Sequence, residues 1–286
     1  MSTNHIRTVI TEGVNATDLP RLQALIAICQ QHDQIHFPVN VAETPGTALL
    51  YYETDTLLGF AYLLGEHNPE LLGAVHPHYR RQGIGRSLLQ TAQTWCRTRQ
   101  QESLLVVGLD TIPAGTAFAK AVGGELSFSE YHMVLSNTDS QSSPFLNEEG
   151  LSLRLATHNE ASEISHLSST AFGDDPAEIE PWITREILRS NRRFFFIELH
   201  GTPIGTISVV GEGEGSIDIT TFGILPAYRQ RGYGRKVLQH TVAMLQAEGW
   251  SQIALDVETD NTNALFLYQS CGFHQQQAYH YFKILL

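Results

Sequence analysis

Cysteine is scarce in this chain of 286 residues: there are three, and no two of them form a Cys-x-x-Cys pair. This scarcity disfavours a disulfide framework and predicts a reduced compartment. Long apolar runs are also missing. No segment approaches the roughly 20 apolar residues that cross a bilayer, and the N-terminal sequence MSTNHIRTVITEGVN lacks the apolar stretch of a signal peptide. We therefore expect a soluble, cytoplasmic protein.

Positive charge is also scarce. The chain has 18 Lys and Arg against 30 Asp and Glu, a formal net charge of −12. This balance disfavours nucleic acid and anionic membrane surfaces as partners. Histidine is more frequent, but no His-Glu-x-x-His motif occurs, and His76 and His78 flank Pro77 in an expected loop. We predict no metal site.

The sequence repeats itself after 149 positions. Val75–Arg86 reads VHPHYRRQGIGR, and Ile224–Arg235 reads ILPAYRQRGYGR. Apolar residues at helical spacing follow each copy. A period this long indicates duplicated domains rather than a solenoid. Between the copies, Ser136–Pro144 has the polar composition of a linker. We therefore predict two domains, at residues 1–138 and 149–286.

The second half alternates strand and helix patterns. Strands are expected at residues 151–156, 193–199, 203–210, 216–224 and 252–257, and helices at residues 161–172, 234–247 and 261–271. Strands that precede a glycine loop, followed by helix, strand, helix and strand, indicate an α+β domain. The sheet should carry helices on both faces.

The glycine loop Arg229-x-x-Gly232-x-Gly234 lies between an expected strand and an expected helix. Glycines there let the backbone approach a ligand, and a helix N-terminus presents unpaired N–H groups to an anion such as a pyrophosphate. The spacing matches neither the nucleoside-triphosphate P-loop nor the dinucleotide fingerprint. The alternative is a tight turn with solvated arginines. The occurrence of the motif in both halves favours a binding loop.

Two motifs together resemble the GNAT superfamily of N-acetyltransferases. The first is the Val-x-Pro-x-Tyr-Arg-x-x-Gly-x-Gly loop, present in both halves with Ile224 at the start of the second copy. The second comprises Asn261, Ala264, Tyr268, Gly272 and Phe273. The tandem arrangement is similar to mycothiol synthase-like proteins. The resemblance implies two tandem α+β domains, each a mostly antiparallel central sheet flanked by helices. It also implies acetyl-CoA as cosubstrate and an amine as acceptor.

The same resemblance implies the residues that bind acetyl-CoA. Loop amides would hold the pyrophosphate, and the preceding strand would lie along pantetheine, with one N–H polarising the acetyl carbonyl. In the second half these residues are Phe222, Gly223, Ile224, Arg229, Gln230, Arg231, Gly232, Tyr233, Gly234, Arg235 and Asn261. In the first half they are Gly73, Ala74, Val75, Arg80, Arg81, Gln82, Gly83, Ile84, Gly85 and Arg86.

Two residues are the catalytic candidates. Tyr268 matches the family tyrosine that assists the leaving thiolate; the alternative is a packed helix tyrosine. Asp218 stands where many members carry a glutamate base. An ordinary ammonium and an ordinary aspartate differ by about 6 pKa units, or roughly 9 kcal/mol. Asp218 would therefore act through water, or after attack has acidified the nitrogen. A solvated carboxylate is the alternative.

The first half departs from these motifs. The position that matches Tyr268 is Ala119, or Lys120 if Gly124 is the equivalent glycine, and neither offers a phenol. Pro69 matches Asp218. The first domain is therefore expected to be non-catalytic, although its loop is intact.

The acceptor should be a small molecule or a peptide amine. Asp174, Asp175, Glu178 and Glu180 stand where the family builds its acceptor wall, and favour a cationic acceptor; the alternative is a charged, solvent-facing loop. Phe172 and Trp182 either line that pocket or pack in the core. Two other functions stay open: an acyl-CoA-binding sensor or scaffold without turnover, and transfer of a longer acyl group.

Overall fold

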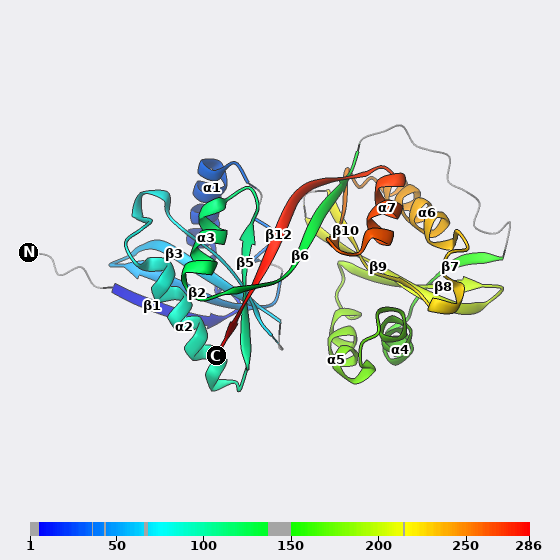
Figure 1. The fold of residues 1–286 in the computed structure, drawn as a ribbon, viewed down its shortest axis with the longest axis horizontal. Coiled ribbons are helices and arrows are strands. Elements are labelled where there is room, and N and C mark those ends of the chain that lie inside the picture. Colours follow the sequence, from blue (N-terminus) through cyan, green and yellow to red (C-terminus); the bar gives the residue numbers. More distant parts are fainter. Residues whose placement is uncertain (1–5, 36, 43, 66–67, 137–149, 214) are drawn as a thin grey trace, which may run out of the picture. The chain divides into compact units, whose positions relative to one another are not determined.

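The structure, a computed structural model, describes residues 6–35, 37–42, 44–65, 68–136, 150–213 and 215–286. It separates into two compact units (Figure 1). Unit 1 comprises Met1–Glu130 and Gln277–Leu286, and unit 2 comprises Tyr131–Gln276. Each unit thus includes a short segment from the opposite half of the sequence, which the predicted ranges 1–138 and 149–286 do not anticipate. Residues 137–144 of the predicted linker lie outside the described residues.

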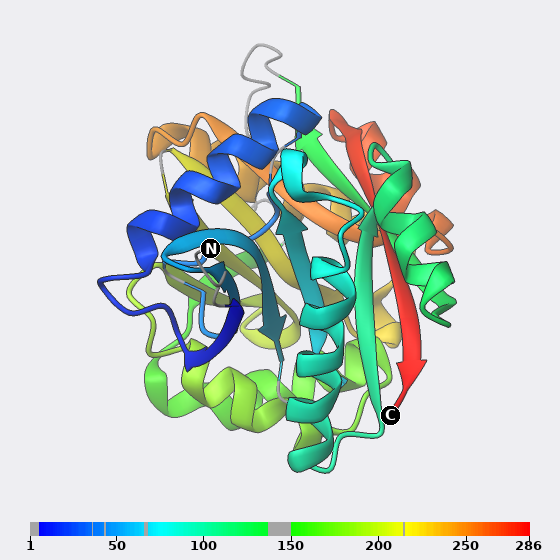
Figure 2. The ribbon, with the colours of Figure 1, turned by 90° about the vertical axis from the view of Figure 1, so that its left-hand side faces the viewer.

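Unit 1 is a sheet with helices on both faces. Its elements are β1 (Ile6–Glu12), α1 (Leu19–Asp33), β2 (Thr47–Glu53), β3 (Thr56–Leu64), β4 (Glu70–Val75), α2 (Ile84–Thr98), β5 (Ser103–Leu109), α3 (Pro113–Ala121) and the end of β12 (Phe273–Leu285). The strand order is β1-β2-β3-β4-β5-β12. Alternating strand residues bury their side chains against α1 on one face and against α2 and α3 on the other. Figure 2 shows the ribbon of this unit.

Unit 2 has the same plan. Its elements are the end of β6 (Glu125–Leu135), β7 (Leu151–Leu155), α4 (Ala161–Phe172), α5 (Pro176–Glu186), β8 (Arg192–Leu199), β9 (Thr202–Gly213), β10 (Ser216–Ile224), α6 (Tyr233–Ala247), β11 (Gln252–Glu258), α7 (Thr262–Ser270) and the start of β12. The strand order is β6-β11-β10-β9-β8-β7. Helices α6 and α7 cover one face, and α4 and α5 lie on the other (Figure 1).

The expected α+β class and the helices on both faces are confirmed, with one refinement. Each sheet is mixed, because β4 pairs with β5, and β10 with β11, in parallel. A helix, α2 or α6, lies in the connection between the two strands of each pair, and such helical crossovers join parallel neighbours. These parallel pairs position the site described below.

Helix α5 corrects one expectation. The alternative to an acceptor wall at residues 174–180 was a charged, solvent-facing loop. The chain is instead helical from Pro176. The side chain of Asp175 accepts a hydrogen bond from the Ala177 amide at 2.9 Å, which caps the helix, and Pro176 occupies the first helical position. Ile179 and Ile183 then pack toward the core. An Asp-Pro pair followed by apolar residues four apart was the available sequence signal.

Candidate active site

Strands β10 and β11 share only a short ladder. Ser216, Ile217 and Asp218 pair with Gln252, Ile253 and Ala254, and the described register ends there. The rest of β10, including Phe222, Gly223 and Ile224, continues beyond that ladder. A strand edge with unpaired N–H and C=O groups is suited to bind an extended chain that carries amides. The predicted pantetheine-binding residues therefore lie at the open part of this strand.

Unit 1 has the same short ladder, but its neighbouring strands pair differently. Between β4 and β5, the described pairs are Glu70 with Leu105 and Leu71 with Val106, so Gly73, Ala74 and Val75 lie beyond the ladder. Those three residues continue in unbroken antiparallel register with β3. The first unit therefore has the opening without any irregularity in the strand that lines it.

In unit 2 that strand contains a bulge. On its β9 side, Thr220 pairs with Ser208 and Gly223 pairs with Thr206, so β10 has one residue more than its partner. Thr221 absorbs the extra residue with a φ of 49°, a conformation that β-branched residues rarely adopt. A bulge rotates the neighbouring peptide groups out of the ladder. It can therefore aim an N–H into the opening beside β11.

The glycine loop leads into the N-terminus of α6. Gln230 and Gly232 adopt positive φ values of 59° and 82°, and Lys236 donates the first intrahelical bond to the carbonyl of Gly232. The amides of Tyr233, Gly234 and Arg235 precede that bond, so they have no intrahelical acceptor. Their N–H groups form an anion-binding end. In unit 1, Arg81 and Gly83 repeat this geometry with φ values of 64° and 88°.

The first arginine of each loop is an anchor. The Nε of Arg229 donates to the carbonyl of Ile224 at 2.8 Å, and one terminal nitrogen donates to the carbonyl of Ala171 at the end of α4. Arg80 donates in the same way to Val75 at 3.0 Å. The Nε bonds hold each loop to its own strand, and in unit 2 the second bond ties the loop to α4 as well. Phosphate recognition would therefore depend on loop amides and on the other basic side chains, such as the exposed Arg231.

Tyr268 lies on α7 and is only 8% exposed. Its ring meets Phe273 edge to face at 6.3 Å, and burial raises the pKa of its phenol to about 12. The phenol therefore stays protonated at neutral pH. Asn261 begins this helix, where its side chain accepts a hydrogen bond from the Ala264 amide at 3.2 Å. The side chain of Asn261 thus has a capping role, distinct from the predicted role in acetyl-CoA binding.

The structural counterpart of Tyr268 in unit 1 is Ala119. Helix α3 ends just before Gly123, which has a φ of 89°, as α7 ends just before Gly272, which has a φ of 95°. The two glycines are equivalent, so counting from Gly123 gives Ala119, and Lys120 is not the match. Ala119 is fully buried in the core of unit 1. That position offers no proton donor.

Asp218 lies at the end of the β10–β11 ladder. Its neighbours Ile217 and Ile219 point into the core under α6 and α7, so its own side chain is on the α4 and α5 face. Pro69 replaces it in unit 1 and uses its carbonyl to accept a hydrogen bond from Leu105 at 2.9 Å. The carboxylate at this position therefore belongs to unit 2 alone.

Two residues on the same face were missed by the sequence analysis. The Nδ1 of His132 on β6 is 2.8 Å from a carboxylate oxygen of Asp256 on β11. The pair comes from different halves of the sequence, 124 residues apart. No local motif joins such residues. When the two halves are aligned, Tyr281 matches His132 and Val107 matches Asp256, so neither the histidine nor the carboxylate recurs.

The residues predicted to wall an acceptor site lie on or beside α4 and α5 and differ in exposure. Asp174, Asp175 and Glu178 are exposed at the start of α5. Trp182 packs edge to face on Phe194 at 6.3 Å, which assigns it to the core. Phe172 remains 53% exposed beside Gly223, where an added Cβ would lie 3.2 Å from its ring. Phe172 is therefore an exposed aromatic side chain beside the predicted pantetheine-binding strand.

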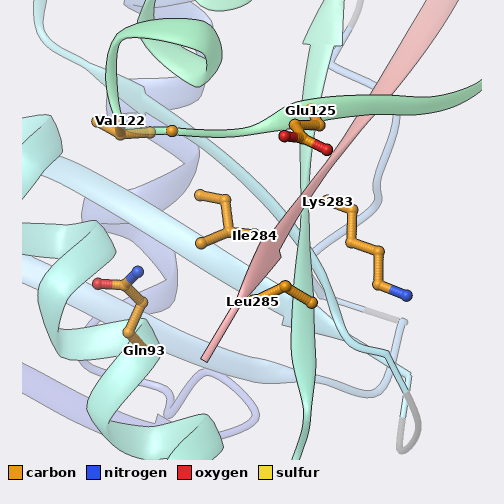
Figure 3. Close-up of a pocket in the computed structure, with 7 residues that line it drawn as sticks. Gln93, Val122, Glu125, Lys283, Ile284 and Leu285 are labelled. Carbon is orange, nitrogen blue, oxygen red and sulfur yellow. The ribbon is translucent and has the colours of Figure 1, made fainter.

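The described residues contain no group of three His, Cys, Asp or Glu side chains able to hold a metal ion. No helix among them is long and apolar enough to span a membrane. A cavity of about 490 Å³ occurs in unit 1, between α2, the end of α3 and β12 (Figure 3). Its lining residues, which include Gln93, Glu125 and Lys283, contain none of the predicted site residues.

Known proteins resemble this chain in sequence and in fold. The model of the Acetyltransferase (GNAT) family matches residues 18–123 and 159–273. A mycothiol acetyltransferase from Thermobispora bispora is 29% identical over 239 residues, 79% of each chain. The N-alpha-acetyltransferase RimI of Mycobacterium tuberculosis is 29% identical over 131 residues, 44% of this chain and 80% of that one. A tandem GNAT protein from the clavulanic acid biosynthesis pathway has the same fold, with a TM-score of 0.78, 17% identity and 98% coverage of both chains.

The fold and the paired loops thus define an acyltransferase. The chain belongs to the acetyltransferase (GNAT) family and contains two tandem domains of it. Acetyl-CoA is the cosubstrate of that family. The loop amides at the start of α6 and the open edge of β10 fit its pyrophosphate and its pantetheine.

Proposed function

We propose that unit 2 transfers an acetyl group from acetyl-CoA to an amine by direct attack. The observation that carries this proposal is that three features occur together in unit 2 and are missing at the matching places of unit 1. The bulge at Thr221 and the carboxylate of Asp218 both lie on β10, and the phenol of Tyr268 lies on α7, which packs on the core of the same unit. Unit 1 has regular strand, Ala119 and Pro69 at the matching places.

In the proposed reaction, acetyl-CoA binds by its pyrophosphate to the α6 amides and by its pantetheine along Phe222–Ile224. The amine nitrogen attacks the thioester carbon, and an N–H near the bulge stabilises the negative charge on oxygen. The carbon–sulfur bond then breaks. A phenol with a pKa of about 12 opposite a thiol of about 8.5 makes complete proton transfer uphill by about 5 kcal/mol. Tyr268 therefore donates a hydrogen bond to the departing sulfur, which takes its proton from solvent after release.

The names of the relatives support an amine acceptor of more than one size. One is named for mycothiol and another for N-alpha acetylation. The exposed carboxylates of α5 favour a cationic acceptor. The length of the acyl group depends on the volume at the thioester end, so longer acyl groups belong in the same test.

For unit 1 we propose acetyl-CoA binding without turnover, because its loop keeps the positive φ values of Arg81 and Gly83. A panel of amines incubated with acetyl-CoA and longer acyl-CoAs, with free thiol detected, tests transfer. Calorimetry on the same protein counts the bound cosubstrate. Thiol release that depends on an amine supports the proposal, and binding without any release would favour a sensor or scaffold.

A further inference from the structure

Three titratable side chains from three neighbouring strands share one face of the unit 2 sheet. His132 of β6 and Asp256 of β11 are 2.8 Å apart through Nδ1 and Oδ1. Asp218 of β10 pairs with Ala254, two residues before Asp256, so the side chains of Asp218 and Asp256 point the same way. Their neighbours Met133, Ile217 and Leu255 fill the core on the opposite face. The group therefore lies on the α4 and α5 side, at the end of the β10–β11 ladder.

The histidine–carboxylate pair has no counterpart in unit 1. There β12 takes the place next to β5 that β6 takes next to β11. The residues 149 positions from His132 and Asp256 are Tyr281 and Val107, and these two pair directly across β12 and β5. Tyr281 donates instead to Glu130 at 2.7 Å. At the matching positions of unit 1 the pair is therefore absent, whereas unit 2 has it together with the bulge, Tyr268 and Asp218.

We infer that His132, oriented by Asp256, accepts the proton that the acceptor nitrogen loses during acetyl transfer in unit 2. This inference rests on the proposed function. The Asp256 carboxylate accepts the Nδ1–H of His132, so the neutral ring has its lone pair on Nε2. The side chain is 18% exposed, against 45% for Asp256, so the histidine is the more sheltered of the two.

The charges around His132 make it a better proton acceptor than a carboxylate alone. Burial by itself lowers the pKa of His132, but the hydrogen bond and charge of Asp256, with the charge of Asp218, outweigh it and raise the pKa above the usual 6.5. An ammonium has a pKa of about 10.4, so an imidazole base closes more than a third of the roughly 6-unit gap that faces an ordinary aspartate. Asp218 then acts through its charge, by stabilising the imidazolium.

The step balances as follows. A neutral amine forms its nitrogen–carbon bond to the acetyl carbon, one N–H proton passes to Nε2 of His132, and the carbon–sulfur bond breaks. CoA leaves as thiolate, hydrogen-bonded by Tyr268. His132 then gives its proton to solvent and the thiolate takes one up, so the products are an acetamide and CoA thiol. No oxidant, metal or second cosubstrate is required.

The first experiment is a pH profile with an amine found in the screen. His132→Gln should lower kcat/KM for the amine by roughly 10²-fold or more and remove the acid limb of the profile. Acetyl-CoA affinity should stay within twofold. Asp256→Asn should move the acid limb to lower pH, because it removes the negative charge of Asp256, which helps to raise the pKa of His132. His274→Gln is the matched control: a strand histidine of the same unit with an Nδ1 contact of 3.0 Å to Ser136. Its profile should match wild type.

The second experiment needs no turnover. Titration of the histidine ring protons by NMR should give His132 a pKa above 6.5 that falls in both Asp256→Asn and Asp218→Asn. A pKa unaffected by either change would overturn the arrangement itself. Full activity and an unchanged acid limb in His132→Gln would overturn the base role while the proposed function stands. A wild-type protein that releases no CoA with any amine would overturn the proposed function and the base role together.

Discussion

Arg80 donates to both carboxylate oxygens of Asp33, at 2.9 and 2.6 Å, and so ties the glycine loop of unit 1 to the end of α1. The equivalent Arg229 reaches the carbonyl of Ala171 at the end of α4 instead. The equivalent arginines of the two loops thus both tie their loop to a helix end, but they bind different acceptor groups there. In both units, the guanidinium is engaged by the protein before any phosphate arrives.

The first prediction follows from that ion pair. The hydrogen bonds from Arg80 lower the pKa of Asp33, so this carboxylate stabilises the fold above its unfolded pKa of about 3.9 and loses that effect as pH falls through its lower folded pKa. Asp33→Asn should reduce the free energy of unfolding by about 1–3 kcal/mol at pH 7. Urea unfolding at a series of pH values checks this, and the difference from wild type should narrow in acid. A difference of equal size at every pH would assign the loss to packing.

The second prediction concerns the cofactor loop. An added Cβ at Gly234 would lie 3.4 to 3.9 Å from Leu267, Ile224 and Phe222, so a larger side chain would enter the space beside the open strand. Gly234→Val should weaken acetyl-CoA binding at unit 2 by roughly tenfold or more, which is about 1.4 kcal/mol. Calorimetry on the folded variant measures it. Gly85→Val makes the matched change in unit 1 and should leave the unit 2 site intact; unchanged affinity in Gly234→Val would contradict the loop assignment.

The third prediction separates binding from chemistry at Tyr268. Tyr268→Phe keeps the buried ring against Phe273 and removes only the hydroxyl. Turnover should fall by roughly 10²-fold, while the acetyl-CoA dissociation constant changes little, because the phenol acts on developing charge. With a pKa of about 12, Tyr268 should produce no loss of activity below pH 10 in the wild type. Lys120→Ala, in exposed sequence of unit 1, is the control. Near-normal turnover without the phenol would make Tyr268 a packing residue.

The fourth prediction concerns the carboxylates of α5. The fourfold change of Asp174, Asp175, Glu178 and Glu180 to Asn or Gln should raise the KM of a cationic acceptor at low ionic strength and leave acetyl-CoA kinetics unchanged. Long-range attraction is screened beyond about 8 Å at physiological salt, so the effect should shrink as salt is added. Asp175 must become Asn rather than Ala, because Asn also caps a helix and Ala would cost about 1 kcal/mol. If the KM changes neither with the four substitutions nor with salt, the cluster is only a solvated helix end.

Several features could be predicted from the sequence because short-range chemistry encodes them. The repeat, the glycine loop and the start and end of most helices in the second half follow from residue type and spacing. Helix α4 runs from Ala161 to Phe172 as predicted, and α6 begins one residue before the predicted Gly234. Glycine at a positive φ, such as Gly232, is a local requirement that any chain with this turn must meet.

Tertiary structure alone decided which strands complete each unit and which side chains those strands place in it. The segment Tyr131–Leu135 precedes the predicted linker, yet it lies in unit 2, and this places His132 against Asp256. The extra residue at Thr221 likewise becomes a bulge only because β9 fixes the register on both sides of it. Strand pairing joins residues far apart in the chain, and its register is set by whole faces packing against helices. No local pattern in the amino-acid sequence carries that information.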